Sequence, residues 1–205
     1  MTIASSNPSV LLHSPCLRTA DGDVLPTPAE RWFAPVTSAE HRLLARAIGP
    51  VLDVGCGPAR HALALAESGV VSLGIDISLP ALAVARERGA PVLHRSIFDR
   101  VPGHGRWGTA LLLDGNIGIG GAPAVLLQRV AELLRPQGRA LIEVGPPGTR
   151  PRRHTVRLEH DGRAGPWFEW AFVGADAIHQ LATDAGLRVG DVWTDGARWF
   201  AQLDK

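Results

Sequence analysis

The sequence predicts an α/β fold: a doubly wound, mostly parallel sheet of seven strands, with an antiparallel last strand and a β-hairpin inserted after the fifth strand. Two observations support this prediction. Between residues 51 and 144, short apolar runs alternate with amphipathic helical patterns, which is typical of parallel βαβ units with helices on both sheet faces. Later in the chain, Asp161-Gly162 and Asp195-Gly196 each separate two extended runs, the pattern of a β-hairpin.

The expected elements follow one another with short connections. Two helices are predicted within residues 28–48, the second with its N-cap at Ser38. The first five strands of the sheet are predicted at 51–54, 70–75, 91–94, 109–113 and 139–144, with helices at 59–68, 79–88 and 122–134. The inserted hairpin joins 154–160 to 165–173, a helix over 175–185 stops at Gly186, and strands 187–194 and 197–203 complete the sheet.

Length and composition predict one compact domain. A chain of 205 residues with 45% hydrophobic content buries a sufficient core on its own. Residues 1–37 are expected to form an N-terminal arm and cap, irregular over 1–27. Residues 38–205 are expected to form the cofactor-binding domain, with the hairpin insertion at about 152–173.

Charge and residue spacing exclude several classes of function. A net charge of +1 supplies no field for nucleic acid, and no apolar run is long enough to enter a membrane. Two cysteines and eight scattered histidines show no metal-ligand spacing, so no metal is expected. The first fifteen residues lack the pattern of a secretion signal, and a cytoplasmic location is therefore expected.

The most informative segment runs from Val51 to His61, where an apolar strand containing Asp53 leads into a helix through two glycines. Gly55 and Gly57 allow a sharp turn and leave bare backbone next to a ligand. The free N–H groups at the start of the helix suit an anionic group. Asp76 closes the next strand, where a carboxylate can accept both hydroxyls of a ribose. The pattern predicts a site for a nucleotide-like cofactor.

The same segment distinguishes between cofactors. A dinucleotide site would carry a third glycine where this chain has Arg60. Asp53 would repel a pyrophosphate but attract an ammonium group. S-adenosylmethionine offers an ammonium group, a carboxylate and a ribose, and therefore fits the pattern better than NAD.

Three motifs together resemble the class I S-adenosylmethionine-dependent methyltransferases of the small-molecule type. They are Asp53-Val54-Gly55-Cys56-Gly57, Asp76 at the end of the second strand, and Leu134-Arg135-Pro136-Gln137-Gly138 before the fifth strand. The resemblance covers about residues 40 to 203 and implies a Rossmann-like fold with S-adenosylmethionine as cofactor. It implies the following cofactor-binding residues: Asp53, Gly55, Cys56 and Gly57 around the methionine part, Asp76 and Ile77 near the ribose, and Ser96 and Ile97 near the adenine. Many relatives have an acidic residue in place of Ser96, so two possibilities stay open here: Ser96 contacts the adenine through its backbone alone, or Asp99 takes over the contact.

The loop after the fourth strand, Asp114 to Gly121, is expected to form a wall of the active site. Asp114 and Gly115 are placed among the cofactor-binding residues. Two roles stay open for Asp114 and Asn116: they hold the cofactor's amino group or the acceptor, or they form a turn and cap the next helix. The loop lacks the proline and aromatic residues of enzymes that methylate DNA bases. No catalytic residue is assigned, and His94 and His154 are interpreted as structural.

A basic segment lies between the fifth strand and the inserted hairpin: Arg150, Arg152, Arg153, His154, Arg157 and Arg163. It has two interpretations, a binding surface for an acidic acceptor or a solvated loop. The aromatic residues that follow, Trp167, Phe168 and Trp170, alternate with polar ones and predict a strand with one apolar face.

The predicted function is methyl transfer to a small organic acceptor, with an O, N or C nucleophile, by in-line displacement. A possibly acidic small molecule is thus the expected partner, and the oligomeric state stays open. Two alternatives remain: an NAD(P)-binding oxidoreductase, and a non-catalytic cofactor-binding partner protein. An RNA methyltransferase would have only the arginines in its favour and would require strongly salt-dependent binding.

Replacing Asp76 with alanine is expected to weaken cofactor binding by about 1–3 kcal/mol, since the hydroxyl partners are left unpaired. Calorimetric titration of the folded variant with S-adenosylhomocysteine measures this loss. Unchanged affinity would place the ribose elsewhere.

Overall fold

The computed structural model describes residues 15–25, 29–160 and 162–205. The expectations for residues 1–14, 26–28 and 161, which include part of the arm and Asp161 of the first turn pair, lie outside these ranges.

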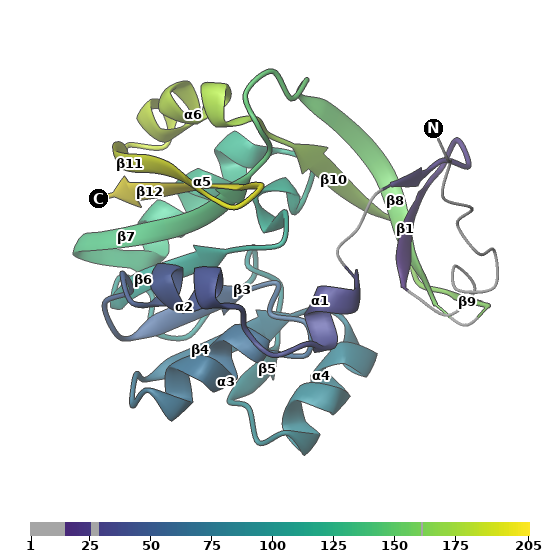
Figure 1. Cartoon of the computed structure of the whole chain (residues 1–205), viewed down its shortest axis with the longest axis horizontal. Helices are drawn as coiled ribbons and strands as arrows, with labels where there is room; N and C mark the ends of the chain where they lie inside the picture. The colour runs from purple at the N-terminus through teal and green to yellow at the C-terminus, as the bar shows by residue number, and fades with distance from the viewer. Residues whose placement is uncertain (1–14, 26–28, 161) are drawn as a thin grey trace, which may run out of the picture.

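A seven-stranded sheet forms the centre of the molecule (Figure 1). Its order is β11 (Arg188–Asp195), β12 (Arg198–Asp204), β7 (Leu134–Val144), β6 (Trp107–Leu112), β3 (Val51–Val54), β4 (Ser72–Asp76) and β5 (Val92–His94). The strands from β7 to β5 are parallel, whereas β12 is antiparallel to both β7 and β11. This confirms the predicted doubly wound sheet with an antiparallel last strand.

Helices cover both faces of this sheet. On one face, α2 (Ser38–Leu44) and α3 (Arg60–Glu67) pack on Val51 and Leu111, and α4 (Leu79–Glu87) packs beside α3. On the other face, α5 (Pro123–Leu133) and α6 (Ile178–Asp184) pack on Leu52 and Val54. Because side chains alternate along a strand, Asp53 shares the face of Val51 and points towards α2 and α3.

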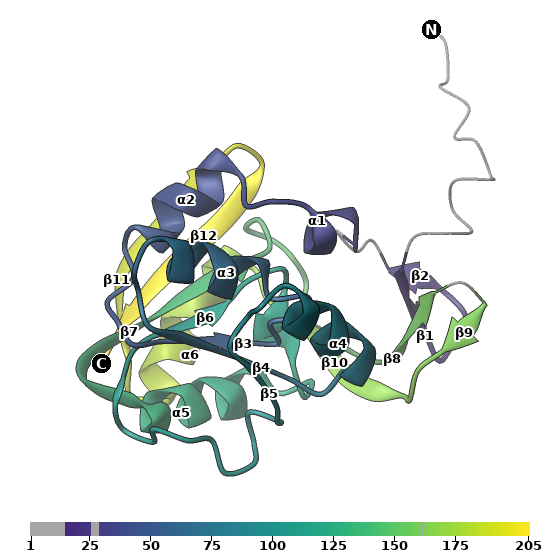
Figure 2. The ribbon, with the colours of Figure 1, turned by 90° about the horizontal axis from the view of Figure 1, so that it is seen from below.

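A second sheet stands at one side of the main sheet, as Figures 1 and 2 both show. Its order is β10 (Phe168–Phe172), β8 (Arg152–His160), β1 (Cys16–Thr19) and β2 (Val24–Leu25), and the short β9 (Arg163–Ala164) also pairs with β8. The inserted hairpin is thus confirmed. The irregular arm expected over residues 1–27 is wrong for 16–19 and 24–25, because β1 adds to the free edge of β8.

The second sheet contacts the main domain through the glycine-rich loop after β6. A Cβ at Gly118, in the 3₁₀ helix η1 (Asn116–Gly118), would collide with the carbonyl oxygen of Ala171 in β10. At Gly121 it would lie 2.9 Å from Cβ of Glu169. These glycines therefore allow β10 to lie directly on the loop.

The ends of two helices, α2 and α6, differ from the predicted positions. Thr37, rather than Ser38, is the N-cap of α2 and forms a capping box with Glu40. The helix expected to continue to residue 48 ends at Leu44, and 3₁₀ helix η2 (Ala175–Ala177) precedes α6. The differences are small because local caps, which sequence patterns locate poorly, decide where a helix begins and ends.

Replacing Gly118 with alanine is expected to lower the free energy of unfolding by about 1–3 kcal/mol, since the new methyl group overpacks against β10. Gly165→Ala is the matched control, because its Cβ would meet only one atom, at 3.5 Å. Chemical denaturation measures both, and equal stability of the two variants would contradict the close packing of loop and hairpin.

Candidate functional site

The glycine turn lies at the carboxyl end of β3, beside the end of β4. Gly55 and Gly57 have φ of 69° and 54°, and Gly57 N–H donates to Asp76 Oδ2 at 2.8 Å. Asp76 Oδ1 accepts from Ser78 N–H at 2.7 Å. Burial raises the pKa of Asp76, although these backbone hydrogen bonds oppose the rise. Each carboxylate oxygen keeps a further lone pair for a ligand.

Asp53 is a buried carboxylate without full compensation. It is 1% exposed, and among the residues that the structure describes its Oδ2 has no hydrogen-bond partner. Burial raises the pKa of Asp53 to about 6; His61 and Arg60 oppose this rise, and Asp114 and Asp76 add to it. A ligand cation near this oxygen would relieve the unfavourable burial.

Arg60, at the start of α3, connects the cap helix to the loop after β6. Its side chain is 4% exposed, and its Nη1 lies 2.7 Å from Glu40 Oε1 in α2. Its Nη2 donates to both carboxylate oxygens of Asp114, at 2.9 and 2.7 Å. Arg60 stands at the position where a dinucleotide site has its third glycine, and its side chain forms structural ion pairs with Glu40 and Asp114.

Arg198, near the start of β12, completes the network. Its guanidinium binds both carboxylate oxygens of Glu143 in β7, at 2.8 and 2.6 Å, and donates to Glu40 Oε1 at 2.7 Å. Glu143 Oε2 in turn accepts from the backbone N–H of Asp114 at 2.7 Å. Asp114 has φ of 55°, a conformation that side-chain-bearing residues rarely adopt. The two arginines and Glu143 together hold it there.

Glu40 is fully buried at the centre of these contacts. Burial favours its neutral form, but the contacts with His61, Thr37, Arg198 and Arg60 outweigh burial and hold the pKa of Glu40 well below its usual range. We name the five residues Glu40, Arg60, Asp114, Glu143 and Arg198 the buried ionic network; Glu40 and Arg60 are buried, and the side chains of the other three are 11–14% exposed. Three carboxylates against two guanidiniums give it a net charge of −1.

Asn116 ties the same loop to the glycine turn. Its Nδ2 donates to the carbonyl oxygens of Val54 and Gly55, at 2.8 and 3.0 Å. Neither Asp114 nor Asn116 caps α5, whose N-cap is Ala122. The capping role that the sequence left open for these residues is thus wrong, and both side chains instead hold the loop at the turn.

Four of the predicted cofactor-binding residues, Cys56, Ile77, Ser96 and Ile97, lie in different surroundings. The side chain of Cys56 is buried among the residues of α3 and α4, and burial raises the pKa of its thiol. Ile77 is 57% exposed beside Asp76, but Ile97 is 3% exposed and lies in the core. Ser96 Oγ accepts from Phe98 N–H, and the ring of Phe98 is 44% exposed. Phe98, which the sequence analysis missed, is thus the exposed apolar residue next to Ser96 and Ile97.

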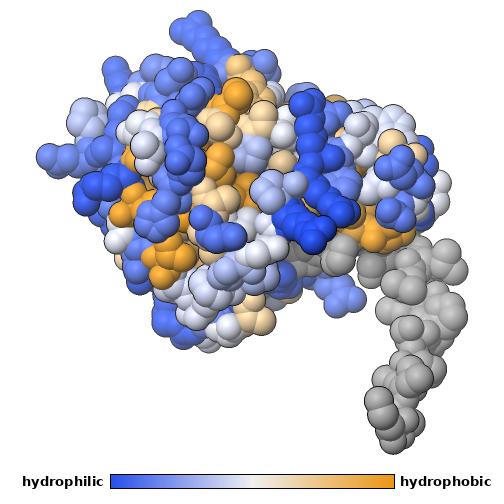
Figure 3. Space-filling model, turned by 90° about the horizontal axis from the view of Figure 1, so that it is seen from above, coloured by the Kyte–Doolittle hydropathy of each residue, from blue (hydrophilic) through white to orange (hydrophobic). Residues whose placement is uncertain are grey.

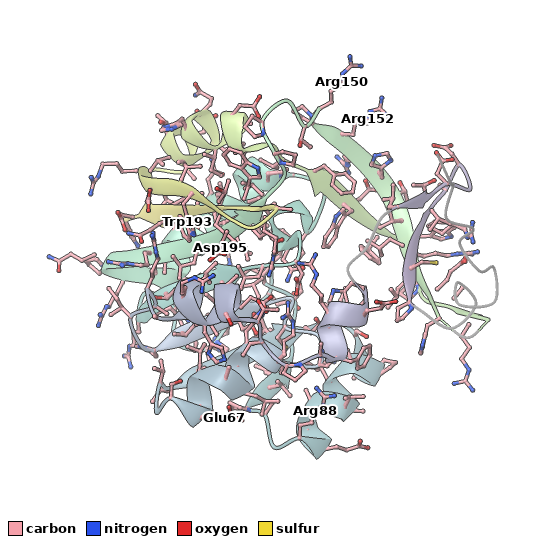
Figure 4. The ribbon with its side chains drawn as sticks, in the orientation of Figure 1. Glu67, Arg88, Arg150, Arg152, Trp193 and Asp195 are labelled. Carbon is pink, nitrogen blue, oxygen red and sulfur yellow. The ribbon has the colours of Figure 1, made fainter. Side chains whose placement is uncertain are left out.

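The arginines of the basic segment do not gather at the glycine turn. Arg150 and Arg152 point outward at the top of the molecule (Figure 4), and Figure 3 shows strongly hydrophilic side chains over the start of β8. Arg153 pairs with Glu169 at 2.6 Å and Arg157 with Glu159 at 2.6 Å. The binding of an acidic acceptor by this segment therefore stays a prediction, and of its arginines Arg153 and Arg157 are already engaged in ion pairs.

The described ranges contain no group of three or more metal-ligating side chains. No helix in the part of the chain that the structure describes is long and apolar enough to cross a bilayer. The site thus consists of the glycine turn, Asp53, Asp76 and the loop held by the buried ionic network. A doubly wound fold with this site defines a protein that binds a nucleotide-like cofactor at the carboxyl ends of its strands.

Comparison with known proteins identifies the class. Residues 51–138 match a family model described as a methyltransferase domain. An S-adenosylmethionine-dependent methyltransferase from Bacteroides fragilis, solved with S-adenosyl-L-homocysteine, is 26% identical, with a TM-score of 0.78 over 93% of this chain and 86% of that one. Residues 51–138 thus form a methyltransferase domain, and the chain has the fold of the S-adenosylmethionine-dependent methyltransferases.

Two further solved structures share the fold at lower identity. The 1,6-didemethyltoxoflavin-N1-methyltransferase of Burkholderia thailandensis is 20% identical, with a TM-score of 0.62 over 82% of this chain and 78% of that one. The glycopeptide N-methyltransferase MtfA is 16% identical, with a TM-score of 0.62 over 84% of this chain and 90% of that one. Both were solved with S-adenosylhomocysteine, the former also with 1,6-didemethyltoxoflavin.

Asp53→Asn is expected to stabilise the ligand-free protein above about pH 6. The raised pKa means that the folded state binds more protons than the unfolded state between about pH 4 and pH 6, so the native protein loses stability as the pH rises through this window. The asparagine variant lacks this loss, and its advantage should grow with pH to about 1–3 kcal/mol.

Chemical denaturation at pH 4 to 8 measures the difference. Asp99→Asn, at an exposed carboxyl group, is the matched control and should show no such trend. If the difference in free energy of unfolding between Asp53→Asn and the native chain does not change with pH, the carboxylate of Asp53 is not destabilised by burial.

Proposed function

We propose that this chain transfers the methyl group of S-adenosylmethionine to a small organic acceptor through an O, N or C nucleophile. The observation that carries the proposal is the unpartnered, buried Oδ2 of Asp53 behind the glycine turn. It suits the amino group of the cofactor, because a buried carboxylate needs a nearby cation.

The other described residues fit the remaining parts of the cofactor. A Cβ at Gly57 would meet no atom within 4 Å, which leaves open space beside the backbone of the turn for the amino-acid part. Asp76 is assigned to the ribose hydroxyls. The exposed apolar side chains of Ile77 and Phe98 suit the adenine, with Ser96 and Ile97 contributing backbone only.

Asp114 and Gly115 are assigned a different role from direct binding of the amino group. The carboxylate of Asp114 already accepts two hydrogen bonds from Arg60. We assign it to positioning the loop, so that Gly115 presents bare backbone where β6 ends. This backbone would face the acceptor.

The cofactor supplies an activated methyl group and its leaving group, so the protein's task is alignment and exclusion of water. The buried ionic network fixes the loop against the glycine turn and thereby fixes the direction from which an acceptor approaches. No residue is assigned as a general base, because an acidic phenol, for example, can ionise without one.

The two alternatives have less support. An NAD(P)-binding oxidoreductase would require room for a pyrophosphate, but Arg60 occupies the third glycine position and Asp53 repels phosphate. A non-catalytic cofactor-binding protein would have the same glycine turn. Only a measurement of methyl transfer distinguishes it from an enzyme.

Calorimetric titration is expected to show binding of S-adenosylhomocysteine and no response to NAD or NADP. Binding at pH 6 should also release protons from Asp53 if a ligand cation lowers its pKa, which buffers of different ionisation enthalpy detect. Binding of a dinucleotide without S-adenosylhomocysteine would falsify the proposal. Transfer of label from methyl-labelled cofactor to an acceptor then separates an enzyme from a binding protein.

A further inference from the structure

The second sheet has one mostly apolar face and one charged face. Residues opposite each other in antiparallel strands lie on the same face. The register of β1, β8 and β10 therefore places Thr19, Arg152 and His154 on one face together with six apolar residues: Leu17, Val156, Leu158, Phe168, Trp170 and Phe172. The other face carries the ion pairs Arg18–Glu159 and Arg153–Glu169. Such a sheet is suited to hold an apolar molecule on its first face.

Trp170 places this apolar face at the active-site loop. Its backbone pairs with Ile119, and its Cζ2 lies 3.5 Å from the position of a Cβ on Gly115. Its Nε1 lies 3.0 Å from the corresponding position on Gly118. Cδ1 of Ile119 in turn lies 2.9 Å from the position of a Cβ on Gly55. A single loop residue, Ile119, thus lies between Trp170 and the glycine turn.

The aromatic surface at this point is only partly covered. Phe168 and Trp170 are both partly exposed, and their rings meet edge to face, with centroids 6.0 Å apart and an interplanar angle of 77°. Within the described ranges the indole N–H of Trp170 has no hydrogen-bond partner in the structure. An acceptor placed here would find a flat apolar surface with one free donor.

The charged groups nearest the loop end of this surface already have partners. Asp114 binds Arg60, Glu169 binds Arg153 and Thr155, and Glu143 binds Arg198. His154 lies opposite Trp170 in the register of β8 and β10, with its ring edge against Phe172, and the exposed Arg152 lies opposite Phe172. Next to Phe168 and Trp170 the surface therefore suits an uncharged ring better than a strongly charged aliphatic acceptor.

We propose that the acceptor is a planar aromatic or heteroaromatic small molecule, and that Trp170 determines this specificity by stacking on its ring. The inference rests on the proposed methyltransferase function and adds the chemical class of the acceptor. Trp170 thus acts as a specificity-determining residue of the acceptor site. The acidic acceptor considered from the arginines is not part of this proposal.

The test uses the full chain loaded with S-adenosylhomocysteine and two probe pairs: 2-naphthol and 8-hydroxyquinoline, each with its decahydro counterpart. The 2-naphthol pair is uncharged at pH 7 and differs in the flat ring. The quinoline pair differs in charge as well, because its saturated amine is protonated at this pH, so the 2-naphthol pair carries the comparison of aromatic with saturated rings. We expect at least one aromatic probe to bind, measured by ligand-observed NMR titration, at least about tenfold more tightly than its saturated counterpart.

Substitutions locate the contact. Trp170→Leu, which keeps apolar bulk without the ring, should weaken the aromatic probe about tenfold, and Trp170→Phe should restore most of its affinity. Trp167→Ala is the matched control, because Trp167 precedes the same strand but lies under Arg157 on the charged face, 4.6 Å from ring centroid to guanidinium. This variant should bind the probe as the native chain does.

The outcomes are distinguishable. If S-adenosylhomocysteine binds but neither aromatic probe does, or the saturated compounds bind equally well, the inference is overturned and the proposed function stands. Equal loss in Trp167→Ala and Trp170→Leu also overturns it. If S-adenosylhomocysteine itself fails to bind, both proposals fall. If Trp170→Leu does not fold, the comparison of aromatic and saturated probes on the native chain still tests whether the acceptor site prefers a planar ring.

Discussion

The arrangement of the site depends on one constraint: the buried guanidinium of Arg60 and the largely buried one of Arg198 share three carboxylates beside the glycine turn. Removing charges from water is costly, and a buried ion pair adds little stability over an apolar replacement of similar volume. Removing only one partner, however, leaves a charge unpaired and costs about 3–5 kcal/mol. We infer that the buried ionic network selects one geometry of the crevice rather than supplying much of the stability.

That geometry connects segments far apart in the chain. Glu40 comes from the cap helix, Arg60 from the helix behind the turn, Asp114 from the loop after β6, and Glu143 and Arg198 from adjacent antiparallel strands. Arg198 of the antiparallel strand β12 binds Glu143, and Glu143 accepts a hydrogen bond from the backbone of Asp114. The ionic contacts therefore connect β12 to the active-site loop. The same loop carries the glycines on which β10 rests, so the cofactor crevice and the proposed acceptor wall share one support.

The sequence was sufficient to predict the main sheet, because its strands and helices have strong periodicity and the turn pairs mark the hairpins. The glycine turn, Asp53 and Asp76 were also predictable from their spacing along the chain. The buried ionic network was not, since pairing between Glu40, Arg60 and Arg198 follows from tertiary contacts alone. The one available signal was an arginine in place of the third glycine. The short strand Cys16–Thr19 was missed because its four residues are too few to show a clear alternation, and because its pairing with β2 and β8 is a tertiary contact.

A double-mutant cycle between Arg60 and Asp114 tests the role of the network most directly. The free energies of unfolding of the native chain, Arg60→Met, Asp114→Asn and the double variant give the coupling between the two side chains. We predict a coupling of at least about 1 kcal/mol, because the second substitution then removes a charge already without its partner. Effects that add to within about 0.5 kcal/mol would show that the two residues act independently, and would contradict the account.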